Sequence, residues 1–206
     1  MRLMRLGVGC LLVVGLSSGS AGGNLVLNAS FEESTRFDRF TDWQSRNVEQ
    51  MGPFIDSFDG FQSVDLAQSQ SGWMQQQLQT DPGELYRLEF YLSANIYAFR
   101  SLPRIARVLW AETVIGEFVW EELGTEDPSE ARFERVVIDN LLAPTGATQL
   151  RFEDASATSG FGAVIDAVVV IPMSEVEVVP SPGTFAMGMV GLVGLMGRRL
   201  QDHARG

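Results

Sequence analysis

A carboxylate interrupts an apolar stretch in the second half of this 206-residue chain. The stretch reads FGAVIDAVVV and spans residues 161–170. Counting by twos, as along a β-strand, places Asp166 on the same side as Val164, Val168 and Val170. A carboxylate that points with core residues is costly unless it is paired or bound to a cation. We therefore expect Asp166 either to ligate a metal ion, or to accept backbone N–H bonds or meet an arginine.

Asp65 raises a similar question in the sequence SVDLA. Its neighbours Val64 and Leu66 take the opposite parity along a strand. We expect Asp65 to form cross-strand hydrogen bonds rather than to act as a ligand or a catalyst.

The central part of the chain lacks the residues on which most catalytic mechanisms depend. The chain has no lysine, and its one cysteine and one histidine, Cys10 and His203, lie in the end segments. This removes a Ser-His-Asp triad, a cysteine nucleophile, a Schiff-base lysine and a histidine-ligated zinc site. Pairs of Asp and Glu, as in glycoside hydrolysis, are what remains. No spacing singles out an acid and a base among Glu112, Glu117, Glu121, Glu122, Asp139, Glu153 and Asp154. We therefore expect no enzyme.

Aromatic side chains offer a different chemistry, because a flat ring can stack on the apolar face of a sugar. Trp43, near the edge of the first strand, and Tyr97 and Phe99, in the segment NIYAFR, are the candidates for such platforms. The alternative is that the aromatic residues fill the core, as they usually do in a sandwich. The same question applies to Trp73, Tyr91, Trp110 and Trp120.

Short alternating segments separated by turns must position these residues. In residues 84–95, Tyr86, Leu88, Phe90 and Leu92 fall on one face of a strand. Further strands are expected in WMQQQLQT, RIARVLWAE, TVIGEFVWEE, ARFERVVIDNLL, TQLRFEDA and FGAVIDAVVVI, with a turn around residues 112–113 between the second and third of these segments. No amphipathic helix of ten residues is visible. The pattern predicts an all-β protein, a β-sandwich or jelly roll.

Composition limits the partners. The net charge is −11 and there is no basic run, which excludes nucleic acid because its binding depends on clustered Lys and Arg. A hydrophobic content of 45% is enough for a packed core. At about 150 residues per domain, the length fits one domain.

The amino terminus has the order of a secretory signal peptide. MRLMR is basic, residues 6–16 are apolar, and SSGSAGG supplies small residues, so we expect residues 1–21 to be removed after Ala21. The apolar run continues past Cys10, which argues against a lipoprotein cysteine. The exported domain, expected at residues 22–172, then contains no cysteine and no disulfide.

The carboxyl terminus carries a three-part segment. Pro180, Pro182 and Gly183 end a linker expected at residues 173–183; an uncharged run over residues 184–197 follows, and then Arg198 and Arg199. The run is short for a membrane helix, which needs about 20 residues. The arginines mark an end that stays cytoplasmic.

This segment, residues 179–206, resembles the PEP-CTERM sorting signal of bacterial exopolysaccharide-associated proteins. Val179, Pro180, Pro182, Gly183 and Thr184 match its motif, and Ser181 stands where the family has Glu. The resemblance implies transient anchoring in the inner membrane, processing by an exosortase-type enzyme, and release to the cell surface or matrix. The alternative is an ordinary short membrane anchor.

The body of the chain resembles a second family. NLVLNASFEES at residues 24–34, residues 60–95, and FGAVIDAVVV at residues 161–170 follow in the order of the choice-of-anchor C group. That group is a galactose-binding-like jelly roll, close to a domain of unknown function in plant cell-wall-associated proteins. Ala29 replaces its usual glycine. The resemblance implies a jelly roll whose opening strand lies in residues 24–34.

More distantly, the pattern resembles carbohydrate-binding modules with the same jelly roll. In those modules a calcium ion lies where the first and last strands meet. The resemblance implies Glu32 and Asp166 as its ligands, and calcium takes about six to eight oxygen ligands. Such a calcium ion would be structural.

Two non-enzymatic functions follow from these observations. The first is an exported, surface- or matrix-associated protein that binds extracellular polysaccharide. The second is a structural matrix protein without a sugar ligand. A carboxylate-based enzyme acting on glycosides is the third and least supported alternative.

Overall fold

The structure is a computed structural model, which describes residues 23–52, 54–95, 97, 103–120, 132–156 and 160–176. The chain divides into two compact units, Met1–Val176 and Glu177–Gly206, and every described residue belongs to the first. The expected signal peptide, sorting segment and Phe99 lie outside the described residues.

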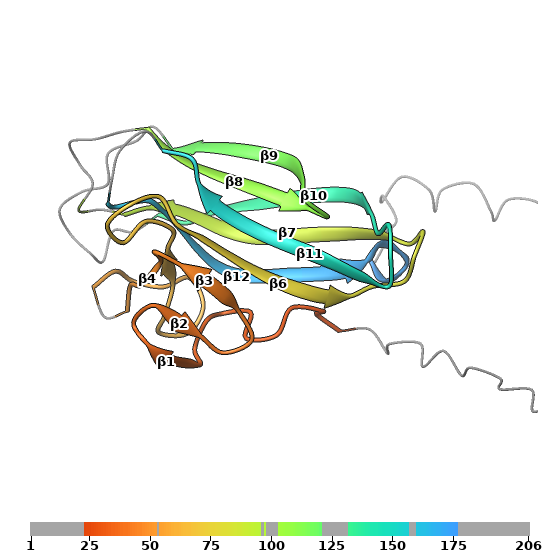
Figure 1. Cartoon of the computed structure of the whole chain (residues 1–206), viewed down its shortest axis with the longest axis horizontal. Helices are drawn as coiled ribbons and strands as arrows, with labels where there is room; N and C mark the ends of the chain where they lie inside the picture. Colours follow the sequence, from red (N-terminus) through yellow and green to blue (C-terminus); the bar gives the residue numbers. More distant parts are fainter. Residues whose placement is uncertain are drawn as a thin grey trace, which may run out of the picture. The chain divides into compact units, whose positions relative to one another are not determined.

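The described residues form two five-stranded antiparallel sheets and a two-stranded ribbon (Figure 1). Sheet I has the strand order β10-β7-β12-β5-β4, and sheet II has the order β3-β6-β11-β8-β9. The strands are β1 (Ser34–Arg36), β2 (Arg39–Phe40), β3 (Gln44–Arg46), β4 (Glu49–Gln50), β5 (Val64–Asp65), β6 (Trp73–Gln79), β7 (Leu85–Ala94), β8 (Arg104–Trp110), β9 (Thr113–Trp120), β10 (Glu134–Leu142), β11 (Ala147–Asp154) and β12 (Ala163–Pro172). A 3₁₀ turn, η3 (Met173–Glu175), follows β12. The predicted all-β sandwich is confirmed.

Alternation of apolar and polar residues builds the sheets. Along β7, Tyr86, Leu88 and Phe90 are buried, whereas Arg87 and Glu89 on the opposite face are only partly covered. β6, β8 and β11 show the same period of two. The inward faces of both sheets meet in one apolar core, so the face assignment predicted for residues 84–95 is confirmed.

A two-residue turn joins β8 to β9. Ala111 and Glu112 both have positive φ, 48° and 65°. This is the backbone of a hairpin turn whose twist matches that of the flanking strands. The turn predicted around residues 112–113 is confirmed, one residue earlier than expected.

The opening segment differs from its prediction. Residues 24–33 run beside β12 but form no regular strand. The Asn24 side chain bonds the main chain of Val168 and Val170, and the main-chain N–H of Leu25 donates to Val170. Asn28 and Phe31 have φ values of 48° and 59°, which interrupt an extended backbone. The expected strand is therefore an irregular edge, held by side-chain and isolated main-chain bonds.

β12 contains a bulge that changes which residues face the core. Asp166 lies opposite Tyr91, and Val169 lies opposite Glu89, with a register shift between them. Ala167 there has a φ of 49°. A bulge inserts one extra residue and so reverses the parity of everything that follows. The prediction that Asp166 shares a face with Val168 and Val170 is wrong, because those valines pack in the core while Asp166 faces outward with Tyr91.

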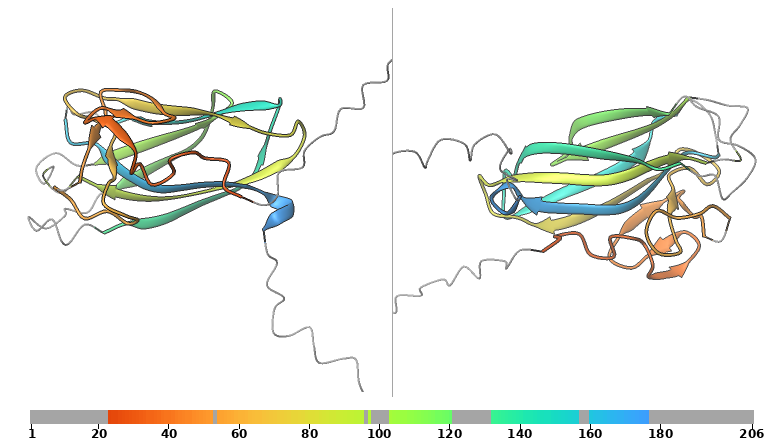
Figure 2. Two further views of the ribbon diagram at one scale, coloured as in Figure 1. Left: turned by 90° about the horizontal axis from the view of Figure 1, so that it is seen from below. Right: turned by 180° about the vertical axis from the view of Figure 1, so that it is seen from behind.

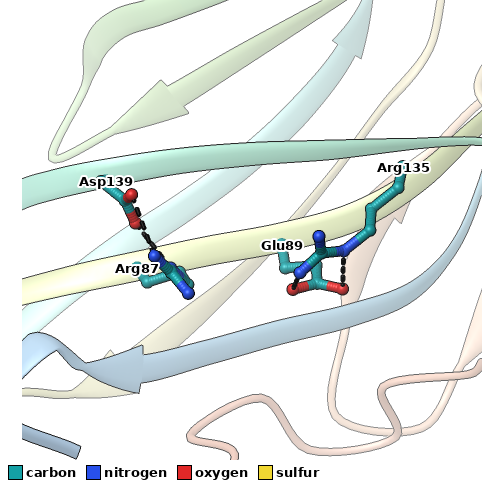
Figure 3. A network of polar contacts seen from close by, with 4 residues as sticks. All are labelled: Arg87, Glu89, Arg135 and Asp139. Carbon is teal, nitrogen blue, oxygen red and sulfur yellow. Dashed lines mark hydrogen bonds and ion pairs between the residues drawn. The ribbon is translucent and has the colours of Figure 1, made fainter. Parts of the chain in front are cut away.

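The outer face of sheet I carries ion pairs over β7 and β10 (Figure 3). The Arg87 guanidinium donates to both carboxylate oxygens of Asp139, at 2.6 and 3.0 Å. Arg135 makes the same two-bond contact with Glu89. Seen from behind, β7 lies between β10 and β12 (Figure 2). This half of the face is a solvated surface, and exposed pairs of this kind contribute about 0–1 kcal/mol each.

Within the described part of the chain, no helix has the length and apolar character needed to cross a membrane.

We expect residues 22–172 to fold without the segments on either side. β12 ends at Pro172, and η3 beyond it buries no residue, so trimming there removes little contact. The circular dichroism spectrum and melting temperature of this fragment should match those of the full chain. A fragment that fails to fold would place part of the core in the flanking segments.

Candidate functional site

A loop covers the outer face of sheet I beside β12. We call residues 54–62 the site loop. Asp166 on β12 is fully buried beneath it. Its Oδ2 accepts main-chain N–H bonds from Phe58 and Asp59, at 2.8 and 2.9 Å, and its Oδ1 accepts the N–H of Ala167 at 2.7 Å. Of the roles expected for Asp166, the structure therefore shows that of an acceptor of backbone N–H bonds.

Glu32 holds the other half of the site loop. Its Oε1 accepts the main-chain N–H of Phe61 and of Gln62, at 2.8 and 2.9 Å. Gly60 turns the loop between the two carboxylates with a φ of +73°, and a Cβ on it would lie 2.3 Å from Glu32 Oε1. Both the conformation and the close approach require glycine at this position.

Apolar contacts fix the underside of the site loop. Ile55 packs with Met51 against Val164 of β12, in a small cluster separate from the main core. The ring of Phe58 stacks on that of Tyr91 in β7, with centroids 3.4 Å apart and planes 13° apart. The site loop is thus attached to two strands of sheet I by side chains as well as by its main chain.

A second buried carboxylate, Asp65 on β5, lies on the same side of sheet I, opposite Val164. It accepts the main-chain N–H of Ala67 and Gly162 and the side-chain amide of Asn95, at 2.7, 2.8 and 2.6 Å. The prediction that Asp65 is a hydrogen-bonding residue between strands is confirmed.

Burial changes the proton affinity of both carboxyls. It raises the pKa of Asp65 from 3.8 to about 7, while the bonds from Asn95, Ala67 and Gly162 oppose the rise. Burial also raises the pKa of Asp166 to about 7, against the N–H bonds that it accepts. Each carboxyl is therefore stabilised in its neutral form relative to water.

A cavity of about 380 Å³ opens beside the site loop. Its lining includes the polar side chains of Gln50, Asp56, Ser57 and Gln62, together with Ile55 and Phe61. Ser57 Oγ and Gln62 Oε1 are buried and have no hydrogen-bond partner in the protein. Buried polar atoms are nearly always paired, so these two are candidates for a partner that the protein itself does not supply, such as a water molecule.

One exposed aromatic ring lines this cavity, and three others lie on or beside the site loop. Phe61, in the cavity lining, is 85% exposed, and Phe54, Phe58 and Tyr97 are about half exposed. The Tyr97 hydroxyl donates to the main-chain oxygen of Phe54 at 3.3 Å. Of these four rings, the sequence predicts only Tyr97 as a platform. The signal that this prediction missed is the segment FIDSFDGF, in which three phenylalanines alternate with turn-forming Asp, Ser and Gly.

Trp43 is not a platform. Only 7% of it is exposed, because its ring packs against Phe31 and Phe152 in the core. Its Nε1 donates to the main-chain oxygen of Asn28. Trp110 and Trp120 are also buried, so these three residues follow the core alternative. Trp73 is partly buried, with the Arg151 guanidinium 4.7 Å from its ring centroid.

The implied calcium ligands do not fit a calcium ion as they lie. Main-chain N–H groups point at both oxygens of Asp166 and at Oε1 of Glu32, where a cation would need free lone pairs. Among the described residues, no three acidic, histidine or cysteine side chains gather as a metal site. Calcium binding at Glu32 and Asp166 stays a prediction of the resemblance. The N–H geometry favours the alternative, in which these carboxylates accept main-chain hydrogen bonds.

The pH dependence of folding should report Asp65. Because its folded pKa lies above the unfolded value, its contribution to stability is complete below about pH 3.8 and is lost as pH rises through about 7. Relative to Asp65→Asn, the wild type should lose free energy of unfolding from pH 5 to pH 8, by up to about 1.4 kcal/mol per pH unit. Urea unfolding of both proteins measures this. An equal difference at both pH values would contradict it.

No protein-family model matches the sequence, and no curated protein matches it. Solved structures do resemble it, and two of them each match over 73% of this chain and 99% of their own. One is TmCBM61 in complex with β-1,4-galactotriose, with 18% identity and a TM-score of 0.50. The other is the K3 cleaved adhesin domain of Lys-gingipain from Porphyromonas gingivalis, with 15% identity and a TM-score of 0.54. At these identities the likeness shows the fold alone: an all-β sandwich of the kind found in a carbohydrate-binding module.

Proposed function

We propose that this protein is an exported, non-enzymatic protein that binds an extracellular polysaccharide at the site loop. The observation that carries the proposal is the cavity beside Phe61. It combines a ring that is 85% exposed with two buried polar atoms, Ser57 Oγ and Gln62 Oε1, that lack partners. A pyranose offers an apolar face to the ring and hydroxyls to the polar atoms, which is the usual division of work in a ligand pocket.

The fold supports a saccharide as the ligand class. The same sandwich holds β-1,4-galactotriose in the TmCBM61 structure. Its relation to this chain is one of fold, so the sugar itself is left open. The site loop supplies the local chemistry that the fold alone does not.

The carboxylates on the strand faces support a binding role rather than catalysis. Glu89 and Asp139 are each held by an arginine on sheet I, and Glu117 and Glu153 share Arg107 on sheet II. A glycosidase needs one protonated and one ionised carboxyl flanking the scissile bond. A carboxylate held in an arginine ion pair is not free to act as a general acid or as a nucleophile.

Export and sorting complete the proposal. The signal peptide at residues 1–21 directs the chain outward, and residues 179–206 anchor it transiently in the inner membrane. An exosortase-type enzyme then processes the anchor at the motif around Pro180 and Pro182, with Arg198 and Arg199 on the cytoplasmic side. The domain reaches the cell surface or matrix, where polysaccharide is available.

Replacing Phe61 by Ala should weaken saccharide binding about tenfold, or roughly 1.4 kcal/mol, because the stacking surface is lost. The full chain is titrated with a panel of neutral, acidic and amino polysaccharides by calorimetry. Leu142→Ala is the matched control, since Leu142 is 57% exposed at the end of β10, where it lies opposite Leu85 at the start of β7 and far along β7 from Ala94. The control should bind as the wild type does.

Absence of binding to any polysaccharide, or equal affinity of Phe61→Ala and wild type, would contradict the site. The first result would favour a structural matrix protein without a sugar ligand.

Processing is tested by the mass of the protein released from cells that contain an exosortase. We expect a chain that begins at Gly22 and has lost the arginines at 198 and 199. Replacing Pro180 and Pro182 by alanine should leave the protein in the membrane fraction with the melting temperature unchanged. Release of the chain with its carboxyl terminus intact would overturn the sorting proposal.

A further inference from the structure

Two carboxylates from opposite ends of the domain hold one short loop. Asp166 lies in the last strand and binds the N–H groups of Phe58 and Asp59. Glu32 lies in the opening segment and binds those of Phe61 and Gln62. Four of five consecutive residues around Gly60 thus donate their main-chain N–H to just two oxygen atoms.

These bonds act on the residues that form the proposed site. Phe61 and Gln62 donate their main-chain N–H to Glu32 while their side chains line the cavity. Ser57, whose Oγ is buried and unpaired, directly precedes Phe58, which is held by Asp166 and stacked on Tyr91. The positions of the ring and of the polar atoms therefore depend on both carboxylates.

The donor set also excludes a cation at the same oxygens. An N–H group presents its positive end to the oxygen, so a calcium ion at Asp166 Oδ2 or Glu32 Oε1 would meet two amide hydrogens. Asp59, the next carboxylate along the loop, is already bonded to the Ser30 hydroxyl at 2.5 Å. The chain's own amides occupy the position that the resemblance gives to a metal ion.

We infer that Glu32 and Asp166 are positioning residues of the saccharide site, which fix the site loop through main-chain hydrogen bonds without a metal ion. As far as it concerns saccharide affinity, this inference rests on the proposed function. The part that concerns the loop stands on the hydrogen bonds alone. It implies that both loop order and saccharide binding are independent of calcium.

Variants of Glu32 distinguish an acceptor of main-chain hydrogen bonds from a calcium ligand. Glu32 is suitable for this test because it is exposed and its replacement leaves the core intact. Glu32→Ala removes the acceptor, and saccharide affinity should fall about tenfold. Glu32→Gln keeps an acceptor oxygen but loses the charge that a calcium ligand needs. If Glu32 only holds amides, Glu32→Gln should bind saccharide nearly as the wild type does.

Amide hydrogen exchange of the full chain, read by NMR, tests the loop without any sugar. In the wild type with a calcium chelator, the amides of Phe58, Asp59, Phe61 and Gln62 should remain protected and the melting temperature unchanged. In Glu32→Ala, protection should be lost at Phe61 and Gln62 and kept at Phe58 and Asp59. Asp166→Asn, where it folds, should show the reverse pattern.

Loss of protection or a lower melting temperature on chelation would overturn the inference, as would a Glu32→Gln variant that behaves like Glu32→Ala. If no polysaccharide binds, the proposed function fails, but the exchange pattern still decides whether the two carboxylates hold the loop.

Discussion

The burial of one carboxylate on the outer face of a sheet determines the rest of the site. Asp166 is fully buried, and its burial would cost several kcal/mol if its oxygens had no partners. The site loop has the converse need, since its main-chain N–H groups must find acceptors once they leave the solvent. The carboxylate and the loop satisfy each other's need for a hydrogen-bond partner, because Phe58 and Asp59 donate their main-chain N–H groups to Asp166. The course of the loop over sheet I follows from this exchange, and the cavity follows from the course of the loop.

The bulge in β12 makes that exchange possible. Before it, Val164 and Asp166 face the loop; after it, Val168 and Val170 face the core. A regular strand would have placed all four on one side, with the carboxylate among the valines. The extra residue at Ala167 thus lets one short apolar sequence serve both the core and the site. The left-handed φ of Ala167 is the local conformational cost of a sequence that contributes to both the core and the site.

The sequence was informative where structure is local. The alternation in β7 and the hairpin after β8 were predictable, because a period of two and a short turn depend on neighbouring residues. The parity of Asp166 was not predictable, since the apolar residues before Asp166 and after Ala167 give no sign of a bulge between them. The loop partners of Asp166, which are Phe58 and Asp59, could not be predicted for another reason. They lie more than a hundred residues away along the chain, and nothing in a single sequence pairs them.

The aromatic residues show the same limit. Trp43 and Phe61 both precede or follow turn residues, yet one is buried against Phe31 and the other is 85% exposed. What separates them is the surface that each loop meets after folding. The aromatic-rich segment FIDSFDGF carried a usable signal, because three large rings in a turn-forming stretch cannot all reach a core.

The attachment of the site loop bears on how tightly an exposed ring can bind. A ligand that orders a flexible loop loses the free energy spent on that ordering. Phe61 is exposed as a side chain but fixed as a main chain, because Glu32 holds its N–H and the next one. Phe58, three residues earlier, is stacked on Tyr91 and leaves the loop little freedom to move as a whole. The main chain that carries the Phe61 ring is therefore fixed before any ligand arrives, and a ligand that stacked on this ring would not have to order the loop.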